Sequence, residues 1–151
     1  MRISQVKDMF KQVSEFHGEL ADYYEHLSDS AEQERVKMLL DHLGSHERHL
    51  KESLKAYEGD TSRHVMDAFV DCVACDQILI TCRQTPVTPE MSVEGVIRVA
   101  MDVDTCLQHF YREVADTADS ETVREVFRNL IDQEESELRR LALDAMGVEE
   151  M

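Results

Sequence analysis

The sequence has few turn-forming residues, with five glycines and two prolines in 151 positions. A sandwich or barrel of many short strands needs a turn after each strand, and glycine and proline most often supply those turns. Their scarcity excludes such folds and favours long, uninterrupted elements. We therefore predict an all-helical protein.

Basic residues are also scarce: 16 lysines and arginines stand against 32 aspartates and glutamates, which gives a net charge of −16. A nucleic-acid partner or an anionic membrane surface needs basic patches, so both are excluded as partners, whereas cations are attracted. The chain also lacks an apolar run of about 18 residues, so no transmembrane helix is expected.

The N-terminal residues lack the apolar stretch of an export signal. The four cysteines, Cys72, Cys75, Cys82 and Cys106, are therefore expected to be reduced thiols in the cytoplasm, where they act as small apolar residues. Cys72-Val-Ala-Cys75 is a CxxC motif, but it lies inside a helical pattern, so a redox role is a disfavoured alternative. Because no second such pair is present, a rubredoxin-like centre is excluded.

The composition, 42% hydrophobic and 32% charged, fits one globular domain over residues 1–151. Apolar residues recur at alternating steps of three and four, which is the spacing of one buried helix face. This periodicity predicts four long helices, over residues 3–28, 32–58, 90–117 and 120–146.

Short loops predict that these helices form two antiparallel hairpins, 3–58 and 90–146, joined by a crossover over 59–89. The crossover is helical in pattern from Ser62 to about Arg83, long enough to let the second and third long helices run parallel. Thr88 and Pro89 supply a cap for the third long helix.

An internal repeat supports this architecture. A shift of 87 residues superimposes Tyr24 on Tyr111 and Glu47 on Glu134. The expected fold is therefore a four-helix bundle made from two copies of one hairpin.

Five ionisable residues interrupt the apolar faces of the four helices. They lie at matching depth, about 15 residues or ~22 Å from the hairpin turns. Glu137 lies one turn further along than the others. The five are His17, Glu47, Asp104, Glu134 and Glu137.

Burial of four carboxylates beside one imidazole is costly unless protons, cationic side chains or a metal compensate it. No lysine or arginine lies on the four apolar faces. Carboxylate oxygen and imidazole nitrogen suit iron, manganese or zinc, so a metal site is favoured. The alternative is a wet bundle end or a neutral hydrogen-bonded cluster.

Two segments resemble a known family: HGELADYYEHLSDSAEQERVKMLLDHLGSHERHL and DTCLQHFYREVADTADSETVREVFRNLIDQEESEL. They are similar to the ferritin-like superfamily, closest to its rubrerythrin-like branch, in which each hairpin carries Glu on one helix and Glu-x-x-His on the next. Here the corresponding positions are His17, Glu47 and Leu50, then Asp104, Glu134 and Glu137. Five of the six can coordinate metal, but neither Glu-x-x-His motif is intact.

The resemblance implies a non-haem di-metal carboxylate centre, with iron expected and manganese or zinc as alternatives, and without haem or nucleotide. Such a centre activates dioxygen or peroxide, or oxidises ferrous iron, so a ferroxidase or peroxidase activity with an unidentified electron donor is one expectation. Its ligands would be the five interrupting residues. Tyr24 and Tyr111 are candidate hydrogen-bond donors to them, although a role as ordinary core aromatics is favoured.

Two alternatives stay open. A stripe of histidines lies beside the apolar face of the second helix: His42, His46 and His49. This stripe either faces solvent or forms a secondary or inter-subunit metal site. Rotation of His46 or His49 inward is disfavoured, because each lies about 100° to 200° around the helix from Glu47. The alternative function is a metal-free structural or interaction module, with the crossover or an outer face forming a homodimer or partner surface.

Overall fold

The structure is a computed structural model that describes residues 3–84 and 91–149. Four long helices dominate it, which confirms the all-helical prediction. The long helices are α1 (Val6–Ser30), α2 (Glu34–Asp60), α5 (Val93–Thr117) and α6 (Glu121–Glu149). The shorter elements are β1 (Ile3–Gln5), α3 (Arg63–Met66), β2 (Phe69–Asp71) and α4 (Cys75–Cys82).

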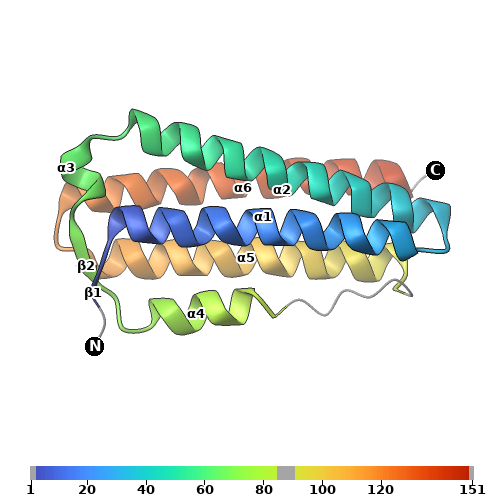
Figure 1. Ribbon diagram of the computed structural model, residues 1–151, viewed down its shortest axis with the longest axis horizontal. Coiled ribbons are helices and arrows are strands. Elements are labelled where there is room, and N and C mark those ends of the chain that lie inside the picture. Colours follow the sequence, from blue (N-terminus) through green and yellow to red (C-terminus); the bar gives the residue numbers. More distant parts are fainter. Residues whose placement is uncertain (1–2, 85–90, 150–151) are drawn as a thin grey trace.

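The long helices pack as two antiparallel pairs, α1 with α2 and α5 with α6. Figure 1 shows all four side by side along the long axis of the molecule, with α2 and α5 running in the same direction. Short turns after Ser30 and Thr117 reverse the chain within each pair. The two hairpins predicted from the sequence are therefore present.

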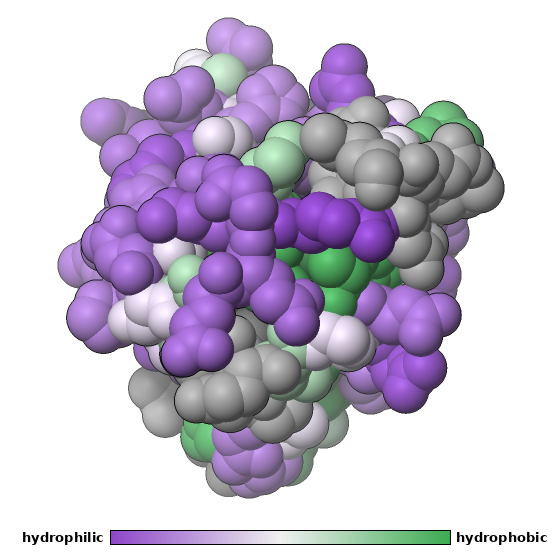
Figure 2. All heavy atoms as spheres, turned by 90° about the vertical axis from the view of Figure 1, so that its right-hand side faces the viewer, coloured by the Kyte–Doolittle hydropathy of each residue, from purple (hydrophilic) through white to green (hydrophobic). Residues whose placement is uncertain are grey.

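The apolar faces of the four helices form one core. At one level of this core, Phe10 of α1 packs edge-to-face on Phe127 of α6, with ring centroids 6.0 Å apart. Tyr111 of α5 lies 6.2 Å from the same Phe127 ring. Hydrophilic residues cover most of the face seen in Figure 2, as the net charge of −16 leads one to expect.

The crossover differs from the prediction of one helix between Ser62 and Arg83. Ser62 caps the short α3, and β2 then pairs antiparallel with β1, with Ser4 opposite Val70. The start of the first helix shifts for the same reason: residues 3–5 form β1, and the Val6 amide donates to the Ala68 carbonyl. This pairing satisfies backbone groups that a helix would otherwise satisfy internally.

The third long helix begins at Val93 rather than at residue 90. The Ser92 side chain caps it by accepting a hydrogen bond from the Gly95 amide. The predicted cap at Thr88 and Pro89 lies outside the described residues.

The prediction of reduced thiols is wrong. Cys72 pairs with Cys75 at the start of α4, and Cys82 at its end pairs with Cys106 of α5. Disulfides persist in oxidising compartments, so this pairing removes the cysteine argument for the cytoplasm. Within the described residues, no helix is both long and apolar enough to cross a membrane.

Candidate metal centre

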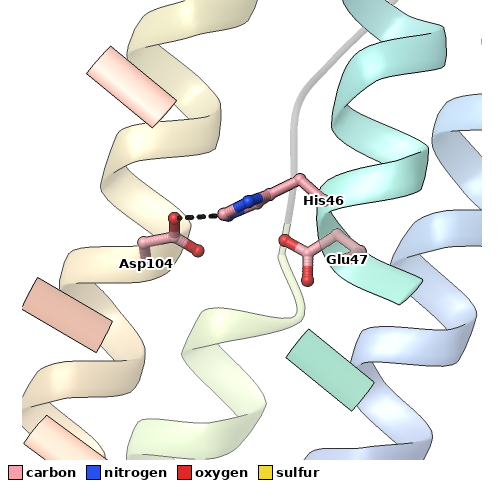
Figure 3. Close-up of side chains that lie close together, drawn as sticks. All are labelled: His46, Glu47 and Asp104. Atoms are coloured by element: carbon pink, nitrogen blue, oxygen red, sulfur yellow. Dashed lines mark ion pairs between the residues drawn. The ribbon is translucent and has the colours of Figure 1, made fainter. Parts of the chain in front are cut away.

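Three buried side chains from two helices converge in the middle of the bundle. His46 and Glu47 extend from α2 and Asp104 from α5, and Figure 3 shows all three pointing toward one another. Each offers one ligand atom, and these atoms lie within 4.8 Å of one another. This group could hold a metal ion.

The buried face of α2 is wide enough to include both His46 and Glu47. Leu39 and Leu40, one heptad earlier, are buried as a similar adjacent pair. Apolar residues spaced alternately three and four apart give two buried positions per heptad. A buried stripe as wide as that of α2 has a third. The expectation that His46 does not turn inward is therefore wrong. The Leu39-Leu40 pair was the sequence signal for its burial.

A second group adjoins the first and shares Glu47 with it. A hydrogen bond of 2.6 Å joins His17 Nδ1 on α1 to Glu47 Oε2. The other ring nitrogen, Nε2, lies 3.8 Å from Glu134 Oε1 on α6. Glu47 therefore lies between His17 on one side and His46 with Asp104 on the other.

Glu137 lies at the outer edge of this layer. Its Oε2 atom is 3.8 Å from His46 Nδ1, and its Oε1 atom is 3.5 Å from Nε2 of the exposed His49. Arg140, which is exposed, approaches Oε1 to 3.9 Å. All five predicted residues thus lie in one connected cluster, to which the structure adds His46.

Several polar atoms of this cluster are buried without a hydrogen-bond partner in the described part of the chain. Buried polar groups are normally paired, and an unpaired one costs about 1–3 kcal/mol. Most of these atoms are oxygens that can accept a cation. They are His46 Nε2, Asp104 Oδ1 and Oδ2, Glu134 Oε2 and Glu137 Oε2.

Burial raises the pKa of Glu47, although the nearby His17 opposes the shift. Burial and the charges of Asp104, Glu47 and Glu137 raise the pKa of Glu134 well above its usual value. Burial alone would lower the pKa of His46, but its interactions with Asp104, Glu47 and Glu137 raise it. A metal ion bound by these groups would therefore compete with protons for them.

Tyr24 and Tyr111 flank the cluster from α1 and α5. Both are buried, and burial together with nearby carboxylates raises the pKa of each phenol well above its usual value. The Tyr24 hydroxyl lacks a hydrogen-bond partner among the described residues. Tyr24 is thus a core aromatic, and its hydroxyl stays a candidate hydrogen-bond donor to the cluster.

Leu50 lies where the family resemblance places a histidine ligand. It lines a small cavity together with His17 and Glu134, as well as Leu54 and Leu130. The cavity has room for roughly one water molecule. Near His17, the cluster therefore has an apolar side chain, Leu50, at the position where the resemblance predicts a further ligand.

Comparisons with known proteins assign no family to this chain. A scan against protein-family models, a search of curated proteins and a search of solved structures each found no match. The structure defines a mostly helical protein with antiparallel helix pairs and a buried His/Glu/Asp group that could hold a metal. The ferritin-like resemblance stays a prediction.

Proposed function

We propose that this protein binds a transition metal in its bundle core, with His46, Glu47 and Asp104 as the primary ligands. The observation that carries the proposal is the convergence of these buried groups, two of which, His46 and Asp104, hold polar atoms that make no hydrogen bond to any residue the structure describes. One imidazole and two carboxylates suit iron, manganese or zinc, and we favour iron.

A second position would use His17 and Glu134, with Glu47 shared between the two ions. The carboxylates of Glu47, Asp104, Glu134 and Glu137 would balance two divalent cations, which removes the cost of burying four negative charges. The parallel course of α2 and α5 and the repeat of the two hairpins support a ferritin-like di-metal arrangement.

Iron bound there with an open coordination position would supply redox chemistry toward dioxygen or peroxide. The chain itself would orient the ligands through the His17–Glu47 hydrogen bond. Leu50, Leu54 and Leu130 would limit water around the second position. The Tyr24 hydroxyl would donate a hydrogen bond to a group held in the cluster; that it makes no hydrogen bond to any other described residue supports this role.

The test replaces the ligand histidine and compares it with a matched surface histidine. We expect His46→Ala to weaken Fe²⁺ or Co²⁺ binding by about 10- to 100-fold or more, the effect typical of losing a supporting metal-site group. His26→Ala, on the exposed face of α1, is the control and should bind like the wild type. Equal affinity of all three proteins, measured by equilibrium titration, would reject this site.

A metal-free interaction module is the second candidate, and exposed apolar residues on the crossover favour it. Phe69, Val73 and Ile80 are 69%, 71% and 52% exposed. A second copy of the chain is the proposed occupant. Light scattering on the wild type and on Phe69→Ser would test this, since a dimer that the substitution dissociates supports it and a monomeric wild type rejects it.

A further inference from the structure

We propose that His49 and Glu137 form an outer capture site from which divalent cations reach the buried centre. This inference rests on the proposed function, because it describes how the same centre is filled. His49 comes from α2 and Glu137 from α6, so the site lies where these two helices meet. Neither residue belongs to the primary ligand set.

Exposure falls stepwise along a row of four side chains that leads inward. The His49 side chain is 54% exposed and that of Glu137 is 12% exposed. The His46 side chain is 6% exposed and that of Asp104 is 1% exposed. The row therefore joins solvent to a buried carboxylate through side chains of types that can ligate metals.

Each intermediate group presents one ligand atom outward and one inward. Glu137 faces His49 through Oε1, at 3.5 Å, and His46 through Oε2, at 3.8 Å. His46 in turn faces Glu137 through Nδ1 and Asp104 through Nε2, the latter pair 3.5 Å apart. Successive groups of the row therefore present ligand atoms 3.5 to 3.8 Å apart, from the exposed His49 to the buried Asp104.

The inner atoms of this row face one another at 3.5 to 3.8 Å without forming hydrogen bonds. Glu137 Oε2, His46 Nε2 and both Asp104 oxygens are buried without hydrogen-bond partners in the described chain. These unpaired atoms favour inward movement, because a cation satisfies each of them in turn. The net charge of −16 would concentrate cations at the outer end.

Arg140 allows a second, independent test of this site. Its guanidinium lies 3.9 Å from Glu137 Oε1, the oxygen that also faces His49. An incoming cation must compete with this positive charge. Arg140 is 67% exposed, so it can be replaced without disturbing the core.

The experiment measures the rate of Co²⁺ uptake by metal-free protein, followed by the visible absorption of the bound ion after rapid mixing. We expect His49→Ala to slow uptake about tenfold and to leave the final cobalt content unchanged. Arg140→Gln should speed uptake. His26→Ala, an exposed histidine on α1, is the control and should load like the wild type.

Uptake by His49→Ala at the wild-type rate would overturn the capture site while leaving the buried centre intact. A fall in both rate and final content would also overturn it, because His49 would then be a ligand of the centre itself. If the wild type binds no cobalt at equilibrium, the proposed function fails and the capture site fails with it.

Discussion

At the scale of single residues, Leu50 and His46 make the two sides of the buried cluster different. Leu50 places an apolar side chain beside His17 and Glu134, whereas His46 turns inward on the other side of Glu47. The candidate ligand atoms of His46, Glu47 and Asp104 lie within 4.8 Å of one another, whereas an apolar side chain lies beside His17. We expect the first metal to bind at His46, Glu47 and Asp104.

Leu50→His tests this difference by adding a candidate ligand beside His17 and Glu134. The new imidazole would enter the cavity that His17 and Glu134 already line, so we expect the metal content at saturation to rise toward two ions per chain. In the absence of metal the same change should destabilise the protein by about 1–3 kcal/mol, because it buries an unpaired polar ring. An unchanged metal content would show that Leu50 does not limit the second position.

Tyr24 gives a prediction that concerns the metal-free protein. Its hydroxyl is buried without a partner in the described chain, so Tyr24→Phe removes an unsatisfied group. We expect the free energy of unfolding to stay equal or to rise by about 1 kcal/mol, measured by urea denaturation with a chelator present. Tyr57→Phe is the control, because that hydroxyl accepts a hydrogen bond from Asn129 Nδ2. A clear loss of stability in Tyr24→Phe would mean that the hydroxyl is paired.

At the scale of elements, the sequence was sufficient to predict the four long helices and their pairing. Their apolar periodicity spans many turns, so it is a strong local signal. The crossover was not predictable in the same way, because β2 exists through pairing with β1, more than 60 residues away in sequence. The five predicted ligands followed from single interruptions of the apolar faces. His46 was not predicted in this way, because its burial depends on how wide a face α2 packs against the neighbouring helices.

The two disulfides that bracket α4 should differ in their effect on stability. Cys82–Cys106 spans a sequence separation of 24 residues and Cys72–Cys75 a separation of 3. A longer closed loop restricts the unfolded chain more, so removing the first bridge should cost about 3.5 kcal/mol and removing the second about 2 kcal/mol.

The measurement is urea denaturation of Cys82→Ala/Cys106→Ala and of Cys72→Ala/Cys75→Ala under non-reducing conditions. Each double variant is compared with the oxidised wild type. A larger loss in the 72/75 variant would contradict the loop-length argument. It would then indicate that the Cys72–Cys75 bridge stabilises the folded junction of β2 and α4, and does not act only by restricting the unfolded chain.

At the scale of the whole molecule, an acidic surface encloses an acidic core. The net charge of −16 opposes compaction, and the buried carboxylates add to this cost unless protons or cations offset it. A metal that binds the folded chain and not the unfolded one therefore stabilises the entire bundle. The gain is about 2.7 kcal/mol when free metal exceeds the dissociation constant 100-fold.

The most direct measurement is the metal content per chain of untagged protein after incubation with Fe²⁺ under anaerobic conditions, read together with the melting temperature. We expect one to two ions per chain and a melting temperature about 5 to 10 °C above that of the chelator-treated protein. His46→Ala should lose most of both effects. Protein that retains no metal and melts at the same temperature with and without a chelator would contradict a metal centre in this core.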